Sequence, residues 1–105
     1  MAKYRIKYAI AAMDDLDAIF DYIAVEDREA AIKMLENIDR AVSRLSEAPY
    51  IGMALQSDEF GLIAMGYRYI VVSPYLVFYR IIGNEVRVGR VLHGRRDWMQ
   101  LLFNR

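Results

Sequence analysis

The 105-residue chain contains no cysteine and a single histidine. Without cysteine it can form neither disulfides nor thiolate-bound metal centres, and one histidine leaves any zinc or iron site dependent on carboxylates. We therefore expect no structural metal and no cofactor. Long uncharged runs are also missing, which excludes a membrane-spanning helix of about 20 apolar residues. Because the N-terminus, MAKYRIKYAI, lacks the features of a secretory signal, the protein is expected in the cytoplasm.

Lysine is absent from the second part of the chain, where acidic residues are also scarce. Residues 1–59 contain seven Lys or Arg against twelve Asp or Glu, whereas residues 60–105 contain seven Arg against Glu85 and Asp97. The two parts therefore carry about −5 and +5, although the net charge of the whole chain is zero. A local basic field attracts phosphates or acidic protein segments. The alternative is that these arginines are scattered, solvated side chains on a sheet surface.

The hydrophobic pattern changes from strand to helix near the N-terminus. Residues 3–9, KYRIKYA, alternate basic with apolar side chains, as in a half-buried strand. Residues 12–26 have apolar side chains at helical spacing, and Asp27 is a suitable N-cap for a second helix that ends before Pro49. The apolar stripes comprise Leu16, Ile19, Phe20 and Ile23, then Ala31, Met34, Leu35, Ile38, Val42 and Leu45. The sequence thus predicts an antiparallel helix hairpin.

The rest of the chain is rich in β-branched and aromatic residues. After a connection over residues 49–66 that has no steady period, we expect strands at residues 67–72, 75–82 and 85–92. Asp97 is a suitable N-cap for a short C-terminal helix. The N-terminal strand would be unstable alone, so it is expected to join the edge of this meander. The predicted fold is a single α+β domain, residues 1–105, with the order β-α-α-β-β-β and two layers, in which a helix hairpin covers one face of an antiparallel sheet.

Two arginines lie on the predicted strands among apolar neighbours. By strict alternation, Arg80 shares a face with Phe78, and Arg90 shares one with Val88 and Leu92. Burying an unpaired charge is costly. Each arginine is therefore expected to meet a carboxylate from the helices or to reach water at an edge of the sheet.

The segment HGRRDW, residues 93–98, combines the side chains best suited to chemistry. His93 could act as a general acid or base, while Arg95 and Arg96 could stabilise a phosphorane-like transition state in RNA cleavage. The structural alternative is that His93 hydrogen-bonds the turn, Asp97 caps the helix and Trp98 fills the core.

The most distinctive segment is YLVFYRIIGNEVRVGRVLHGRRDW, a tyrosine-rich strand followed by the run V-L-H-G-x-R-D. Together with DDLDAIFDYIA and LSEAPYIG, it resembles the RelE/ParE toxin superfamily of bacterial toxin–antitoxin systems, and in particular its ParE-like branch, the plasmid stabilisation family. The resemblance implies a small toxin of a type II system that is held inactive by a cognate antitoxin. It also implies one of two activities, because ParE-like members inhibit DNA gyrase and RelE-like members cleave messenger RNA on the ribosome.

The resemblance also bears on the choice between these activities. The ribonuclease members carry basic residues on the middle strands and another after the last strand. Here Leu76 stands at the strand position of an arginine, and Tyr67 and Tyr69 stand where lysines are expected. A site without these cations would lose much of its transition-state stabilisation. We therefore expect a gyrase inhibitor that is not an enzyme, with a RelE-like ribosome-dependent mRNA endoribonuclease as the alternative. The catalytic residues of that alternative would be His93, Arg95 and Arg96.

The partner implied by the resemblance is a ParD-like antitoxin with a disordered, acidic C-terminal arm that folds on the toxin. We expect the arm's apolar residues to contact Leu16, Phe20, Met34 and Ile38, and its acidic residues to contact Arg68, Arg80 and Arg90. The alternative is that these apolar side chains only line the toxin's own core. Contacts with the target are expected at Arg95, Arg96 and Trp98.

Overall fold

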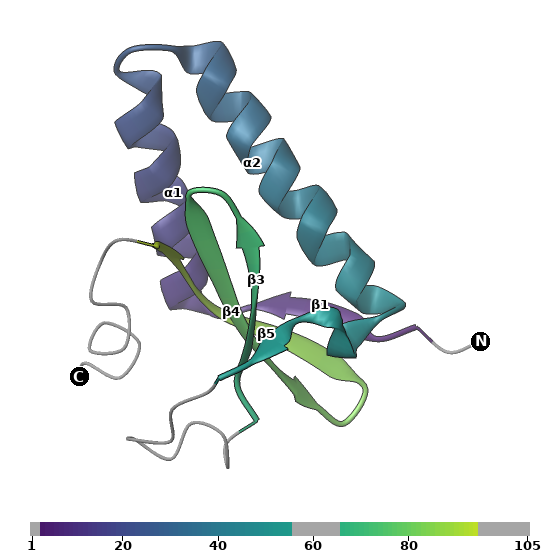
Figure 1. The fold of residues 1–105 in the computed structure, drawn as a ribbon. Helices are drawn as coiled ribbons and strands as arrows, with labels where there is room; N and C mark the ends of the chain where they lie inside the picture. Colours follow the sequence, from purple (N-terminus) through teal and green to yellow (C-terminus); the bar gives the residue numbers. More distant parts are fainter. Residues whose placement is uncertain (1–2, 56–65, 95–105) are drawn as a thin grey trace.

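The computed structural model describes residues 3–55 and 66–94 of the chain. Two long helices, α1 (Ile10–Ala24) and α2 (Arg28–Ser43), form a hairpin that packs on one face of a five-stranded sheet (Figure 1). The α+β fold predicted from the sequence is therefore confirmed. Within the described ranges, neither helix has the length and apolar content that crossing a bilayer would take.

The sheet has the order β1-β5-β4-β3-β2, with β1 parallel to β5 and the other pairs antiparallel. Its strands are β1 (Arg5–Tyr8), β2 (Met53–Ala54), β3 (Arg68–Val72), β4 (Tyr75–Ile82) and β5 (Glu85–His93). The meander of β3, β4 and β5 and the edge position of β1 agree with the sequence analysis. The short edge strand β2 lies in the connection for which no regular element was expected.

The ends of the two helices have local causes. α1 begins at Ile10, earlier than the spacing of its apolar residues predicts, directly after β1 makes its last ladder bond from Ala9 N to Val88 O at 2.9 Å. α2 has the expected N-cap, because the Asp27 carboxylate accepts a hydrogen bond from Ala30 N at 3.1 Å. Two 3-10 turns lead from α2 to the sheet: η1 (Arg44–Ser46) and η2 (Pro49–Ile51).

The main core lies between the hairpin and the sheet. It is built from Ile19 of α1, Ile38 and Val42 of α2, Leu45 of η1, Tyr75, Val77 and Tyr79 of β4, and Val86, Val88 and Val91 of β5. Burying each such side chain contributes roughly 1.5–3 kcal/mol. The opposite face, called the outer face below, has a smaller cluster of Leu55, Phe78 and Leu92. The sheet is therefore apolar on both faces along part of its length.

A β-bulge in β5 changes which side chains share a face. The register between β4 and β5 shifts after Val88 and leaves Gly89 as an extra residue. The expectation that Arg90, Val88 and Leu92 lie on one face is wrong for this reason. Val88 belongs to the main core, whereas Leu92 belongs to the outer cluster and Val91 takes its place on the helix side. One inserted residue inverts the alternation for the remainder of the strand.

Tyr79 of β4 attaches the segment after α2 to the sheet. Its buried hydroxyl donates a hydrogen bond to the Pro49 carbonyl at 2.7 Å and accepts one from the Gly52 amide at 3.0 Å. Gly52 approaches so closely that a Cβ at this position would overlap the hydroxyl. Arg68 of β3 donates from Nη1 to the Gly52 carbonyl at 2.8 Å. These contacts place η2 and the start of β2 against β3 and β4.

The carboxylate of Asp15 joins α1 to β5. One of its oxygens accepts hydrogen bonds from Arg90 Nε at 2.8 Å and from the Val91 amide at 2.9 Å, and the other accepts from Arg90 Nη2 at 3.0 Å. The pairing of β1 with β5 ends at Val88. Beyond this point the Asp15 carboxylate, and not a neighbouring strand, accepts the hydrogen bond of the Val91 amide. The hydrogen bond with Asp15 raises the pKa of Arg90. The expected pairing of Arg90 with a helix carboxylate is thus confirmed.

We predict that Asp15→Ala lowers the free energy of unfolding by about 2–3 kcal/mol, since it leaves a partly buried guanidinium and an amide without their acceptor. Urea denaturation followed by circular dichroism measures this change. Asp17→Ala is the matched control, because Asp17 is exposed on the same helix. Equal denaturation midpoints for the two variants would contradict a stabilising role of the Asp15 contacts.

Candidate functional site

An apolar groove of about 540 Å³ runs along the helix hairpin on the side of β1. Its lining includes Tyr8 of β1, Met13, Leu16 and Phe20 of α1, and Ile32, Leu35 and Ile38 of α2. Met13 and Ile32 are the exposed members, at 53% and 40% of their surface. By contrast, Ile38 is 1% exposed and belongs to the main core. Three of the four apolar residues expected to bind an antitoxin, Leu16, Phe20 and Ile38, thus line this groove, with Ile38 at its floor.

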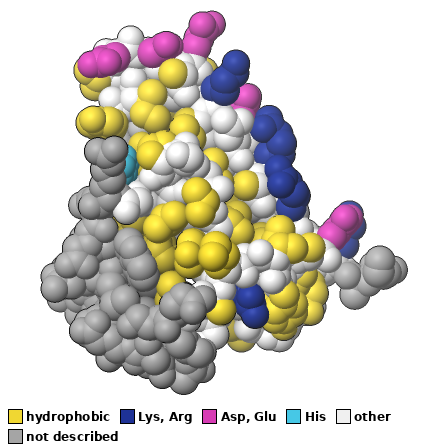
Figure 2. All heavy atoms as spheres, in the orientation of Figure 1, with side chains coloured by type: hydrophobic (Ala, Val, Ile, Leu, Met, Phe, Trp, Pro, Cys, Tyr) yellow, Lys and Arg dark blue, Asp and Glu magenta, His cyan; other side chains and the backbone are white. Residues whose placement is uncertain are grey.

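The border of the groove is acidic. Glu36 and Asp39 of α2 are part of its lining. Burial, together with the charge of Asp39, raises the pKa of the Tyr8 hydroxyl to about 12. The helix on the other side, α1, contains four aspartates and no Lys or Arg. Figure 2 shows more acidic side chains at the tip of the hairpin and hydrophobic side chains across the middle of the molecule. A segment that fills this groove would therefore meet apolar surface bordered by negative charge.

The fourth apolar residue, Met34, lies elsewhere. It lines a second hollow of about 640 Å³ between α1 and the ends of β4 and β5. His93 and Tyr75 line the same hollow, and their rings meet edge to face with centroids 5.6 Å apart. Tyr22 lies at its border and is 79% exposed. The four predicted apolar residues therefore do not form one surface.

The three arginines expected to bind the antitoxin's acidic residues are also separated. Arg90 is bonded to Asp15, and Arg68 donates to backbone carbonyls and lies over the Tyr50 ring, 5.1 Å from its centroid. Arg80 lies over the Tyr67 ring at 5.3 Å on the outer face of the sheet. Two of the three side chains thus hold the fold together, which the sequence could not distinguish from binding.

Only part of the segment HGRRDW can be placed. His93 is on the helix side of β5, packed on Tyr75. Arg95, Arg96 and Trp98, expected to contact the target or to act with His93, lie outside the described residues, as does the helix expected after Asp97. On the outer face, Leu76 packs beside Phe78 in the apolar cluster.

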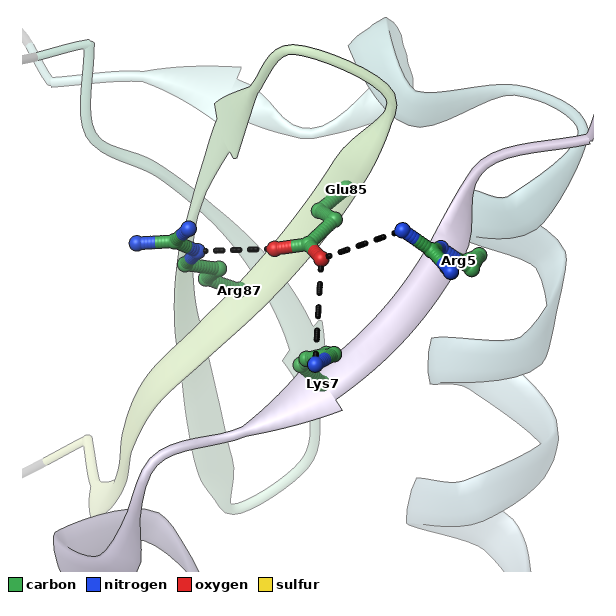
Figure 3. Close-up of polar contacts among 4 residues, drawn as sticks. All are labelled: Arg5, Lys7, Glu85 and Arg87. Carbon is green, nitrogen blue, oxygen red and sulfur yellow. Dashed lines mark hydrogen bonds and ion pairs between the residues drawn. The ribbon is translucent and has the colours of Figure 1, made fainter.

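A cluster of basic side chains lies at the other end of β5, around Glu85 (Figure 3). The Glu85 carboxylate accepts a hydrogen bond from Arg87 Nε at 3.0 Å and forms ion pairs with Arg5 at 3.6 Å and Lys7 at 3.8 Å. The three cationic side chains are 53–67% exposed, whereas that of Glu85 is 13% exposed. The Arg87 hydrogen bond and the charges of Lys7, Arg87 and Arg5 lower the pKa of Glu85. We call Arg5, Lys7, Glu85 and Arg87 the Glu85 cluster.

Comparison with known proteins adds to this geometry. The sequence model of the family described as "ParE toxin of type II toxin-antitoxin system, parDE" matches residues 6–98. The chain belongs to this toxin family. A Sinorhizobium fredii protein with the name "Putative toxin Y4kP" is 31% identical over 103 residues, which cover 97% of this chain and 100% of that protein.

Solved structures agree with the membership in the ParE family. A chain from the chromosomal ParDE toxin–antitoxin system of P. aeruginosa is 27% identical and superposes with a TM-score of 0.71, covering 86% of this chain and 95% of that one. A chain of the RelBE2 toxin–antitoxin complex of Mycobacterium tuberculosis superposes with a TM-score of 0.59 at 24% identity, covering 87% and 98% of the two chains, and so shares the fold. The resemblance to the RelE/ParE superfamily noted from the sequence is thereby confirmed.

Sequence reasoning did not identify the Glu85 cluster of this ParE-family toxin. The signal was present, because Arg5 and Lys7 alternate with apolar residues in β1 and Arg87 lies two residues after Glu85. What was missing was the parallel register that pairs Arg5 with Glu85 and Lys7 with Arg87. Residues that are 80 positions apart in the sequence become direct neighbours only through this pairing.

The lowered pKa of Glu85 predicts how stability depends on pH. A carboxylate whose pKa is lower in the folded state stabilises the fold above its unfolded pKa, and this stabilisation is lost as the pH falls through the folded value. We therefore expect Glu85→Gln to be less stable than the wild type at pH 7, and the difference to shrink as the pH falls below about 4.3, the ordinary value of a Glu carboxyl, until it vanishes below the lower folded value. Thermal unfolding between pH 7 and pH 3 measures it. Glu47→Gln, which removes one exposed ion pair with Lys3, serves as the control. A difference for Glu85→Gln that stays constant over this range would rule out the ionic explanation.

Proposed function

We propose that this ParE-family toxin inhibits DNA gyrase by binding it and that a ParD-like antitoxin prevents this by binding the toxin. The observation that carries the first part is the apolar character of the outer face around β3 and β4. Tyr69 and Phe78 pack there with ring centroids 5.9 Å apart, beside Leu76 and Leu92. Hydrolysis or transfer at a phosphodiester requires cations that converge on the phosphate. Here Phe78 and Leu92 are buried and Tyr69 and Leu76 are partly exposed, while Arg80 and Arg87 lie farther along the same face.

The position of His93 supports the same conclusion. Its ring packs on Tyr75 toward α1. Arg87 of the Glu85 cluster precedes His93 by six residues on β5, which is about 20 Å in an extended strand. A general acid or base at His93 would therefore act far from the described cations of the outer face. A surface of this kind is better suited to contact with another protein than to RNA cleavage.

The apolar groove on the hairpin is the site we propose for the antitoxin. Met13 and Ile32 expose apolar surface in the isolated chain, and a segment placed in the groove would bury it. Because Arg68 and Arg90 are engaged within the fold, apolar contact carries most of the affinity. The acidic border at Glu36 and Asp39 favours a basic residue in the bound segment next to its apolar ones.

The gyrase proposal predicts a specific pair of results. Purified toxin should decrease the supercoiling of relaxed plasmid by gyrase as its concentration rises, and premixing with the antitoxin encoded beside it should restore supercoiling. In cells that express the toxin alone, primer extension should find transcripts without new 5′ ends. New ends that disappear in the Arg96→Ala variant would instead identify a ribonuclease and refute the gyrase proposal.

The groove proposal predicts that Met13→Glu and Ile32→Glu each weaken antitoxin binding about tenfold or more, as expected when a charge enters an apolar contact. Isothermal titration calorimetry measures the affinity, and the unfolding midpoint should stay near that of the wild type because both side chains are exposed. Val25→Glu is the matched control, since Val25 is 85% exposed on the same hairpin but outside the groove. Equal affinities for all three variants would place the antitoxin elsewhere.

A further inference from the structure

A row of positive charges crosses the outer face of the sheet. Lys7 of β1 is the register partner of Arg87 of β5, and Arg87 is the register partner of Arg80 of β4. Direct register partners point to the same face, so these three side chains lie next to one another across three strands. Neighbouring strands are about 4.8 Å apart, which gives the row a length of about 10 Å at the backbone. Tyr67 continues it, because its ring lies 5.3 Å from the Arg80 guanidinium.

This arrangement opposes the usual pairing rules for a sheet. Like charges directly opposite one another destabilise a strand pair, and here two successive pairs are cationic. Among the described residues of this face, Glu85 is the carboxylate that offsets Arg5, Lys7, Arg80 and Arg87. These five described side chains therefore carry an excess of three positive charges, in a chain whose net charge is zero. Residue pairs that are locally unfavourable for stability, such as these like charges, are typical of functional positions when they lie on an exposed surface.

The Glu85 cluster presents its cations to solvent. Glu85 engages Arg87 through Nε, and Figure 3 shows the terminal nitrogens of Arg87 directed away from that carboxylate. Arg5 and Lys7 approach the other carboxylate oxygen at 3.6 Å and 3.8 Å and remain more than 60% exposed. Their ion pairs are long and solvated, so an incoming anion can compete for them at little cost.

The basic side chains on α2 provide a contrast. Arg28, Lys33 and Arg40 alternate along that helix with Glu29, Glu36 and Asp39, so their charges cancel locally. α1 contains only acidic charged residues. A polyanion would therefore be repelled from the hairpin and attracted to the outer face of the sheet.

We propose that Lys7, Arg80 and Arg87, assisted by Arg5, bind the phosphodiester backbone of a nucleic acid, with the Tyr67 ring, over which the Arg80 guanidinium lies, at the end of the row. A row of cations on neighbouring strands suits a strand whose charges repeat regularly, and an adjoining aromatic ring is a feature of single-strand binding surfaces. This inference rests on the proposed function in one respect: the nucleic acid would be the DNA segment held by the inhibited gyrase.

The test is fluorescence anisotropy of the purified full chain with a labelled 20-nucleotide DNA, single-stranded or in duplex, between 50 and 300 mM salt. Each phosphate contact adds about 0.7–0.9 to the slope of log affinity against log salt. The variant Lys7→Gln/Arg80→Gln/Arg87→Gln should lose at least tenfold in affinity at 50 mM salt and about 2 in slope. The single- and double-stranded arms identify which form of DNA the surface prefers.

Two further variants make the result specific. Lys33→Gln/Arg40→Gln/Arg44→Gln removes the same charge from exposed positions on α2 and η1, and it should leave binding within twofold of the wild type. Glu85→Gln removes the competing carboxylate and should increase affinity, whereas a purely structural cluster would give a decrease or no change. Equal losses in the two triple variants, or no binding of either DNA form by the wild type, would overturn the inference.

The alternative occupant is an acidic peptide. Binding of a labelled oligoglutamate through the same three residues, without binding of DNA, would also overturn the inference. The outcome is separable from that of the gyrase assay. Loss of gyrase inhibition with intact DNA binding would refute the proposed function alone, and gyrase inhibition without DNA binding would refute this inference alone.

Discussion

The hydrogen bonds of Asp15 determine how the two layers of this protein fit together. A single carboxylate on α1 accepts from the guanidinium of Arg90 and from the backbone of Val91, at the point where β1 no longer accompanies β5. This fixes the position of α1 over the sheet. The apolar groove on one side of α1 and the hollow around His93 on the other both follow from that position. The Arg90 side chain, which looks like a binding residue in the sequence, therefore shapes the binding surfaces without forming part of them.

The two layers differ in charge as well as in structure. α1 is acidic, while the outer face of the sheet carries the excess of basic groups at the Glu85 cluster and Arg80. The segregation seen between the two parts of the sequence thus becomes a difference between two sides of the molecule. A toxin of a type II system needs separate interactions with its inhibitor and with its target. An apolar groove with an acidic border and a basic sheet face offer two surfaces of different chemistry for these interactions.

Much of the fold could be predicted from the sequence because local physics determines it. The apolar stripes of the helices, the cap at Asp27 and the strands around the turn at Gly83 depend on neighbouring residues and are found where expected. Strand β2 has two residues, too few for any period to appear. The bulge at Gly89 depends on how β5 fits against β4, so alternation assigned Leu92 to the wrong face. The residues expected to bind the antitoxin are separated because tertiary packing, which the sequence pattern does not show, places Ile38 in the main core and pairs Arg90 with Asp15.

The parallel pairing of β1 with β5 gives the protein an unusual order of assembly. Strand β1 cannot pair until β5 has been synthesised, because Arg5–Tyr8 pairs with Glu85–Val88. Until Glu85–Val88 have been synthesised and have left the ribosome, the nascent chain can form its helix hairpin, but β1 has no strand to pair with and its cations have no counterpart. The basic face comes into existence only when β5 enters between β1 and β4. A cell that makes this toxin therefore has an interval, during each round of synthesis, in which the hairpin is available to a binding protein before the opposite surface has formed.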